Sequence, residues 1–192
     1  MISARLYLAI VAAVAIERGF ELIWSRRNLA RAMARGGVER GRNHYRAMVI
    51  VHALFLVSAA AEVLLPGRAF PSIVGWTALV MTGAAQSLRY WVVATLGERW
   101  NTRVIVIPGA PLVTMGPYRF MRHPNYLAVT IEIAALPMIH GCWMTALLFS
   151  LANAVLLSVR IPIEERALGE APQPDRIPSA VAERGARRVH SR

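Results

Sequence analysis

Five long apolar stretches divide the chain, and segments rich in arginine separate them. The stretches cover residues 6–24, 47–65, 73–96, 126–139 and 142–159. An α-helix needs roughly 20 residues to cross a bilayer, so each stretch is a candidate span, and the fourth reaches that length only if its helix begins before Tyr126. The sequence therefore predicts an all-α integral membrane bundle of about five transmembrane helices, whose last two form a hairpin turned at His140-Gly141.

The composition agrees with a membrane protein and excludes several soluble classes. Of 192 residues, 56% are hydrophobic and 17% are charged, whereas soluble domains average about 25% charged residues. A single cysteine, Cys142, excludes a disulfide framework and a cysteine-based zinc cluster, and we expect no metal site. All 22 basic residues are arginine, and because they lie between apolar stretches we expect no nucleic-acid partner. The absence of lysine beside abundant alanine is typical of GC-rich bacterial coding.

The distribution of arginine predicts how the chain crosses the membrane. Seven arginines lie in segment 25–46, four in 97–125 and seven after Val159, whereas segment 66–71 has one and the His140-Gly141 turn has none. Because basic segments stay in the cytoplasm, we predict a multi-pass protein of the bacterial inner membrane with its N-terminus outside and its C-terminus cytoplasmic. A signal peptide is the alternative for the first stretch, but the charges of Glu17 and Arg18 interrupt the apolar core that it would need.

Four acids stand inside or at the ends of apolar stretches, where a charge is costly, and three of them are candidates for more than a solvated side chain. Glu17 and Glu21 are four residues apart and share a helix face, so they are either interfacial acids held in water or members of a buried site. Glu132 lies midway along the fourth stretch, which favours a functional role or a role in pairing helices.

Three further polar residues in the spans are predicted to have ordinary structural roles. Glu62 lies near the outer end of its stretch and is expected to be solvated. Arg89 is followed by Tyr90 and Trp91, as in an interfacial belt, so its side chain could extend to the membrane surface. His52 is expected to be a hydrogen-bonded packing residue.

The densest polar cluster lies in residues 113–126. Gly116-Pro117 predicts a turn, and Pro124 restricts His123 to non-helical conformations. With Pro124 at or near a helix start, His123 and the first free amides of the next helix face the same place, which is favourable for carboxylates and phosphates. The alternative is an ordinary basic, proline-containing entry to a transmembrane helix.

A second cluster follows the fifth stretch, where Arg160 precedes the adjacent acids Glu164 and Glu165. Neighbouring residues on a helix point about 100° apart, so both acids cannot grip one small group equally. A solvated helix end is the alternative interpretation. If the last two helices pack antiparallel, however, this cluster lies close to His123.

The two clusters carry a resemblance to a known family. The sequence GPYRFMRHPNYL, followed by RIPIEERAL, resembles the cofactor-binding half of the isoprenylcysteine carboxyl methyltransferases, which are similar in turn to the membrane phospholipid N-methyltransferases. The resemblance covers about residues 97–168. The N-terminal half resembles the bacterial branch, some members of which O-methylate alkylpyrones or alkylresorcinols. The chain departs from the family pattern after Leu168, where the usual phenylalanine-glycine and spaced tyrosines are missing.

The resemblance implies S-adenosylmethionine (SAM) bound at the cytoplasmic face. Arg160 would lie near the transferred methyl and orient an anionic acceptor, while His123 or Glu164 could take the proton of a phenol. It also implies a methyltransferase domain over residues 1–168. Residues 169–192 have three prolines and few large apolar residues, so we predict a mobile cytoplasmic tail whose arginines can lie on anionic membrane lipids. The positions that match the cofactor pocket are Gly116, Tyr118, His123, Pro124, Tyr126, Leu127, Glu164 and Glu165.

The leading hypothesis from the sequence is an integral-membrane, SAM-dependent O-methyltransferase. Its substrate would be the carboxyl or hydroxyl of a lipid that enters from the bilayer, most specifically a phenolic or pyrone lipid. The alternative is a non-catalytic membrane protein, such as a small transporter or a lipid-binding scaffold, although no inverted repeat supports a transporter. A related membrane reductase is a third interpretation, and the chain has no glycine-rich nicotinamide fingerprint.

Overall fold

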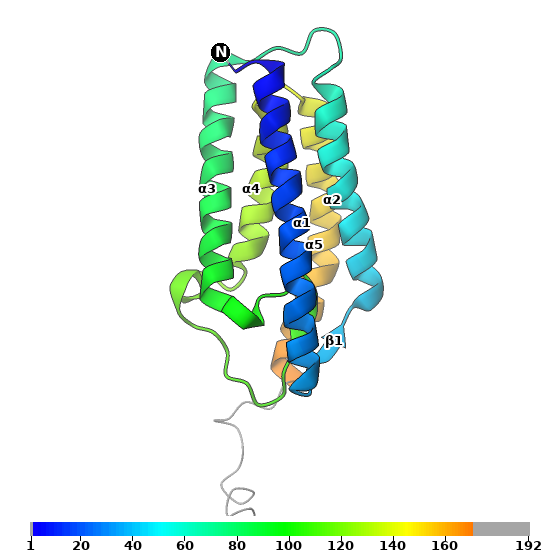
Figure 1. The fold of residues 1–192 in the computed structure, drawn as a ribbon, viewed down its shortest axis with the longest axis vertical. Coiled ribbons are helices and arrows are strands. Elements are labelled where there is room, and N and C mark those ends of the chain that lie inside the picture. The colour runs from blue at the N-terminus through cyan, green and yellow to red at the C-terminus, as the bar shows by residue number, and fades with distance from the viewer. Residues whose placement is uncertain (1, 171–192) are drawn as a thin grey trace, which may run out of the picture.

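Five helices form an elongated bundle in which successive helices run in opposite directions (Figure 1). The computed structural model describes residues 2–170, without the side chains of Asn43 and Glu170. The 31 residues of α1 span about 46 Å, which exceeds the roughly 30 Å hydrocarbon core of a bilayer. The helices are α1 (Ala4–Ala34), α2 (Arg42–Glu62), α3 (Ser72–Leu96), α4 (Pro124–Met138) and α5 (Trp143–Glu170).

The five apolar stretches correspond one to one with the five helices, and α4 and α5 form the predicted hairpin. Pro124 is the first residue of α4, as predicted, because a proline at this position lacks only an N–H that the helix would leave unpaired. Helices α1 and α5 continue beyond their apolar stretches into arginine-rich sequence. The predicted tail begins in the last two residues of α5, and its remaining residues lie outside the described part of the chain.

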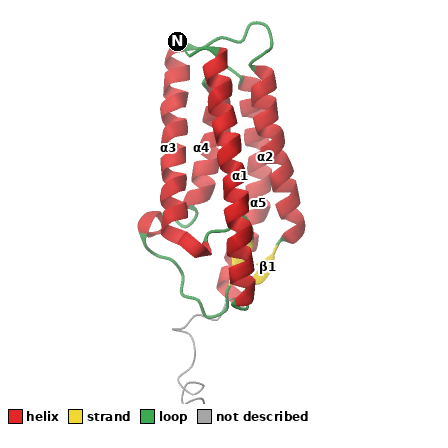
Figure 2. Cartoon of the chain, viewed as in Figure 1, coloured by secondary structure: helices red, strands yellow, loops and turns green. Residues whose placement is uncertain are grey.

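A small sheet that the sequence did not predict joins the loops at one end of the bundle. Strand β1 (Val38–Arg40) pairs antiparallel with β2 (Val104–Val106), with Val38 opposite Val106. This end, the lower one in Figures 1 and 2, also carries the ends of α1, α3 and α5 and the starts of α2 and α4. We call it the basic end, because the arginine-rich segments 25–46 and 97–125 meet there. Two short 3₁₀ helices, η1 (Gly97–Arg99) and η2 (Gly116–Arg119), complete it.

The outer surface of the bundle is apolar, as a lipid environment requires. Phe20, Ile73 and Leu148 are 68%, 83% and 63% exposed, respectively, whereas Tyr7 and Leu136 are fully buried between the helices. Among the described residues, two segments have the length and mean hydropathy to cross a membrane by themselves, His44–Glu62 and Trp143–Gly169. For the other three helices, the prediction of a membrane span remains a prediction.

At the end opposite the basic end, Glu62 closes the start of α5, so the expectation of a solvated side chain is wrong. Its two carboxylate oxygens accept hydrogen bonds from the backbone N–H groups of Met144 (3.2 Å) and Thr145 (2.7 Å). Arg68 pairs with the same carboxylate at 2.9 Å, and Glu62 is only 6% exposed. The first turn of a helix leaves N–H groups without partners, and a carboxylate from another helix is a strong acceptor for them.

Candidate functional site

The start of α4 and the end of α5 meet at the basic end and bring the two predicted clusters together. His123, directly before Pro124, has φ −127° and ψ 59°, a non-helical conformation of the kind that a following proline imposes. Its ring stacks on Tyr126, with centroids 5.3 Å apart and planes 20° apart. His123 Nε2 lies 3.3 Å from Glu165 Oε1, which joins the two helices directly.

The adjacent acids on α5 diverge, as their helical spacing predicts. The Tyr126 hydroxyl donates a hydrogen bond to Glu164, while Glu165 turns toward His123 and lies 3.7 Å from Arg122. The Glu165 side chain is 47% exposed, so this carboxylate is accessible from outside the bundle. The solvated helix end considered for these acids is therefore wrong for Glu164, which is paired with a half-buried tyrosine.

Arg160 lies behind these acids and is 6% exposed. Its Nε donates to the Tyr126 hydroxyl at 2.8 Å, and its Nη2 donates to the backbone carbonyl of Thr102 at 2.7 Å. Arg160 also lies over the Tyr126 ring at 5.7 Å from the centroid. The tyrosine hydroxyl thus bridges a buried guanidinium and a carboxylate, which holds all three side chains in one arrangement.

The Gly116-Pro117 turn forms η2 and supports this cluster from the side. Gly116 has φ +59°, and a Cβ at this position would collide with the Thr95 side chain, so the turn packs against α3 only with glycine there. Tyr118 packs against the buried cluster around Val92. Burial and the nearby Glu164 carboxylate raise the pKa of the Tyr118 phenol above its usual value, so it stays neutral.

Two predicted cofactor residues, Pro124 and Leu127, are apolar neighbours of this group in the chain. Leu127 is 42% exposed, and Pro124 is fully buried at the start of α4. Their contact with a cofactor therefore stays a prediction that no side-chain contact supports. The predicted residues that the structure brings together are Tyr118, His123, Tyr126, Arg160, Glu164 and Glu165.

Sequence reasoning missed Thr102, which connects this cluster to α1 and α2. The Thr102 carbonyl accepts a hydrogen bond from Arg160. The Thr102 N–H donates a hydrogen bond to Ser25 Oγ at 3.0 Å, and the Thr102 hydroxyl donates one to the Tyr45 hydroxyl at 3.3 Å. Asn28 anchors the preceding turn through the carbonyls of Gly97 (3.1 Å) and Trp100 (2.8 Å). No spacing rule could have found Thr102, because it lies in an irregular loop and its partners are more than 50 residues away.

A second polar network lies deeper in the bundle and joins α1, α3 and α4. Arg89 is 7% exposed, and its Nε and Nη2 donate to the two carboxylate oxygens of Glu21 at 2.7 and 2.8 Å. The expectation that Arg89 extends to the membrane surface is therefore wrong. Glu21 is 8% exposed, so the interfacial, water-held alternative for this acid is also wrong. Neither charge has access to water, so each depends on the other as its partner, and removing one would leave the other buried and uncompensated.

Arg18 is the centre of this network. It contacts Glu17 and Glu21 at 3.0 Å, Glu132 at 3.8 Å, and the side-chain oxygen of Gln86 at 3.2 Å. Glu132 is 5% exposed and comes from α4, so the structure supports the predicted role in pairing helices. His52 behaves as expected, since its Nδ1 lies 2.7 Å from the Met48 carbonyl one turn away.

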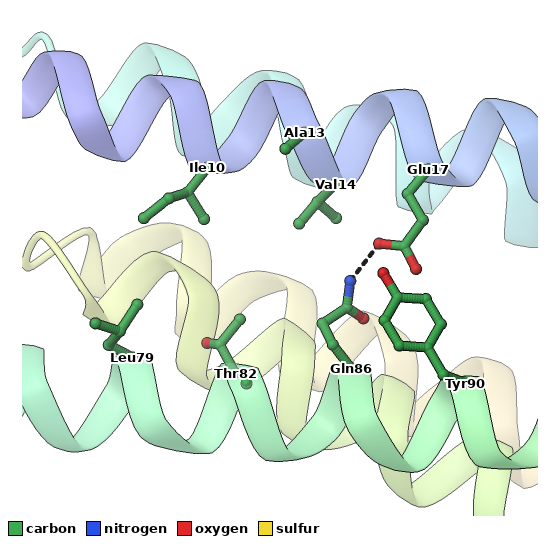
Figure 3. A pocket seen from close by; sticks show the side chains of 9 residues that line it. Ile10, Ala13, Val14, Glu17, Leu79, Thr82, Gln86 and Tyr90 are labelled. Carbon is green, nitrogen blue, oxygen red and sulfur yellow. Dashed lines mark hydrogen bonds between the residues drawn. The ribbon is translucent and has the colours of Figure 1, made fainter.

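A pocket of about 350 Å³ opens between α1 and α3 beside this network (Figure 3). Ile10 and Leu79 line its apolar part, and Glu17, Gln86 and Tyr90 form its polar end, where Gln86 donates a hydrogen bond to Glu17. The pocket lies away from the acids of α5. Among the described residues, no group of histidine, cysteine and acidic side chains is arranged to hold a metal ion.

Comparisons with known proteins agree with the resemblance in the motifs. Residues 76–170 match the isoprenylcysteine carboxyl methyltransferase (ICMT) family. The uncharacterized protein YpbQ of Bacillus subtilis is 39% identical over 166 residues, which cover 86% of this chain and 98% of that protein. An uncharacterized protein of Haemophilus influenzae is 26% identical over 154 residues, which cover 79% of this chain and 88% of that protein. No solved structure gives a significant match.

The family match begins inside α3 and ends with the last residue of α5, so it contains the whole cluster around Tyr126 and Glu164. Members of this family are SAM-dependent methyltransferases of membranes. The chain therefore belongs to the isoprenylcysteine carboxyl methyltransferase family.

Proposed function

We propose that the protein transfers the methyl group of SAM to a carboxyl or hydroxyl oxygen of a lipidic acceptor, most specifically a phenolic or pyrone lipid. The reaction takes place at the basic end, which faces the bacterial cytoplasm, and the N-terminus lies outside. The acceptor reaches the site from the bilayer. The apolar outer surface and the concentration of arginine at one end support this orientation.

One observation carries the proposal: two carboxylates with different partners, Glu164 and Glu165, lie beside the stacked rings of His123 and Tyr126. SAM has a sulfonium, an ammonium and a carboxylate, so its net charge is positive, and its adenine and ribose need an aromatic surface and hydrogen-bond acceptors. Two acids beside two stacked rings offer both kinds of contact.

The described side chains also leave hydrogen-bonding capacity in this place. His123 Nδ1 and Asn125 Oδ1 are buried without a partner among the described residues. Buried polar atoms are normally paired. Two unpaired ones beside an accessible acid are therefore consistent with a bound ligand that supplies the missing hydrogen-bond partners. Among the described residues, Glu165 contacts His123 at 3.3 Å and Arg122 at 3.7 Å, and a cationic group can replace these long contacts. These residues fit SAM: Glu165 would hold its ammonium or ribose, and Tyr126 and His123 would face its ring system.

The bound cofactor supplies an activated methyl group, and the protein supplies alignment. Methyl transfer is an in-line displacement, in which correct positioning of the two reactants contributes more than acid–base chemistry. Arg160 is held by Tyr126 and Thr102, so its guanidinium has a defined place from which to orient an anionic acceptor. A carboxylate acceptor needs no base, and a hydroxyl acceptor can give its proton to Glu164 or His123.

The test is SAM binding by the purified protein in lipid nanodiscs, followed by transfer of labelled methyl to an alkylresorcinol or a long-chain fatty acid. Glu165→Gln keeps the shape of the side chain and removes its charge. A hydrogen bond between charged groups contributes about 1.5–3 kcal/mol, so the variant should bind SAM at least about tenfold more weakly. The matched control is Glu98→Gln, an exposed acid at the same end whose partners are Arg31 and Arg35.

Each outcome decides the proposal. A loss of SAM affinity in Glu165→Gln but not in Glu98→Gln, with methyl transfer by the unchanged protein, supports it. If the unchanged protein binds no SAM, the methyltransferase proposal fails and the non-catalytic membrane protein becomes the better hypothesis. If SAM binds but both variants match the unchanged protein, the assignment of the site to α5 is wrong.

A further inference from the structure

A second groove lies between α1 and α2 at the basic end, on the other side of Thr102 from Arg160. It has a volume of about 340 Å³. Its walls come from one face of each helix and from the loop that leads to β2. The residues that line it are Leu22, Ser25, Arg26, Leu29, Tyr45, Arg46, Val49, Ile50 and Arg103.

The part of the groove farther from the basic end is apolar and open to the outside of the bundle. Leu22 on α1 and Val49 on α2 are half-buried, and Ile50 is 58% exposed on the outer surface. A surface of this kind is in contact with lipid in a membrane protein. An aliphatic chain can therefore enter sideways between α1 and α2 without crossing water.

The part nearer the basic end is positively charged. Arg103 lies over the Tyr45 ring at 4.4 Å and pairs with Glu39 at 2.6 Å. Arg26 and Arg46 face the groove and are exposed, and among the described residues neither has an ion-pair partner. In the part of the chain that the structure describes, no acidic side chain lines the groove. The groove therefore has cationic charge available for an acidic head group.

The groove adjoins the candidate site, and one residue, Thr102, lies between them. Ser25 and Tyr45 line the groove, and both hydrogen-bond to the Thr102 hydroxyl, at 2.8 and 3.3 Å. The carbonyl of the same Thr102 accepts from Arg160 at 2.7 Å. A head group at the Tyr45 end is thus separated from Arg160 by the width of a single backbone segment.

We propose that this groove binds the methyl acceptor, a single-chain amphiphile whose head carries an acidic carboxyl or hydroxyl oxygen. The inference rests on the proposed function and adds the place where the acceptor binds and the two helices, α1 and α2, between which it enters. The tail lies on Leu22 and Val49, and the head lies among Arg26, Arg46 and Arg103. In the reaction an O–CH₃ bond forms and the S–CH₃ bond of SAM breaks, with its electron pair left on sulfur. A carboxylate loses no proton, and a hydroxyl acceptor releases its proton to Glu164 or His123.

The pocket between α1 and α3 fits this role less well. Its polar end is closed by internal contacts, since Glu17 already binds Gln86 and Arg18. It offers an acid rather than arginines to an incoming head group. An acidic amphiphile would meet repulsion there, and its head would lie farther from Thr102.

The experiment is photo-crosslinking in nanodiscs of neutral phosphatidylcholine, with a long-chain fatty acid that carries a diazirine in its tail. We expect labelled peptides from α1 around Leu22–Leu29 and from α2 around Val49-Ile50. Because Arg46 offers a charge-assisted contact, Arg46→Gln should reduce labelling about tenfold. The control is Arg35→Gln, which removes the same charge at the same end from an arginine paired with Glu98. Labelling should also fall when an alkylresorcinol competes, and the methyl ester of the probe should label weakly.

The outcomes separate this inference from the proposed function. SAM binding is measured on every variant, and Arg46→Gln should bind SAM as the unchanged protein does. If SAM binds but the probe labels the pocket around Ile10 and Leu79 instead, the groove assignment is wrong and the methyltransferase proposal stands. If phosphatidylglycerol nanodiscs abolish labelling while alkylresorcinol does not compete, the groove is a phospholipid site and the inference is overturned. If the groove is labelled but no SAM binds, the proposed function fails, and with it the identification of the occupant as a methyl acceptor.

Discussion

Replacing Arg89 by glutamine should destabilise the bundle far more than breaking an ion pair of similar geometry at its surface. Arg89 and Glu21 are 7% and 8% exposed and are joined by two hydrogen bonds of 2.7 and 2.8 Å. Glu98 makes contacts of 3.2 and 2.9 Å with Arg31 and Arg35, but these side chains are 52–59% exposed. The two ion pairs therefore differ mainly in their access to water.

The expected magnitudes follow from that difference. Removing one partner of a buried pair leaves a buried charge uncompensated and costs about 3–5 kcal/mol, whereas an exposed pair contributes about 0–1 kcal/mol. Arg18 also contacts Glu21 at 3.0 Å and compensates part of its charge. The expected loss of stability in Arg89→Gln is therefore near the lower limit of this range, about 3 kcal/mol. For a chain of this size, about 3 kcal/mol corresponds to a fall in Tm of about 6–12 °C.

The assay is thermal unfolding in detergent micelles, followed by tryptophan fluorescence, for Arg89→Gln, Glu21→Gln, the double variant and Glu98→Gln. The double variant removes both charges, so it should be more stable than the sum of the single changes predicts, with a coupling of about 0.5–3 kcal/mol. If Arg89→Gln lowers Tm no more than Glu98→Gln does, burial is not what makes this pair important and the reasoning is refuted.

Three other changes test separate parts of the structure. Glu62→Gln weakens the acceptor at the start of α5, so it should cost about 0.5–2 kcal/mol and speed amide hydrogen exchange in the first turn of that helix. Gly116→Ala combines φ +59° with a collision against Thr95, so it should lower stability by about 1–3 kcal/mol, and Thr95→Ala should restore only part of the loss. Tyr126→Phe keeps the ring stacked on His123 but removes the hydroxyl that Arg160 and Glu164 share, so SAM binding or methyl transfer should fall about tenfold with a much smaller change in Tm. Equal losses in stability and in activity would indicate a purely structural role for that hydroxyl.

The contact between the two ends of the α4–α5 hairpin could be predicted from the sequence. Pro124 marks the start of one helix, and a tight turn at His140-Gly141 reverses the chain into the next. In such an antiparallel pair, the start of the first helix and the end of the second lie at the same end of the bundle. His123 and Glu165 could therefore be expected to meet. The divergence of Glu164 and Glu165 also follows from helical geometry alone.

The interior charges could not be assigned in the same way. The positions of Glu21, Arg89 and Glu132 along their helices are evident in the sequence, but the rotation of each helix about its axis is not. A rotation of about 100°, one residue on a helix, would turn a side chain from the bundle interior toward lipid. The sequence was therefore compatible with an Arg89 side chain that extends to the surface, and only the placement of α3 relative to α1 in the bundle directs it to Glu21.

Local pattern by itself determined the number of helices, the hairpin and the arginine-rich end, because apolar runs, prolines and charged loops act over a few residues. The tertiary structure alone decided which helices pair, where Glu62 and Arg89 find their partners, and that Thr102 connects Arg160 to Ser25 and Tyr45. Those contacts join residues far apart in the chain. They form only when the helices pack together, and packing favours the arrangement that pairs these polar groups, because a buried polar group without a partner costs about 1–3 kcal/mol.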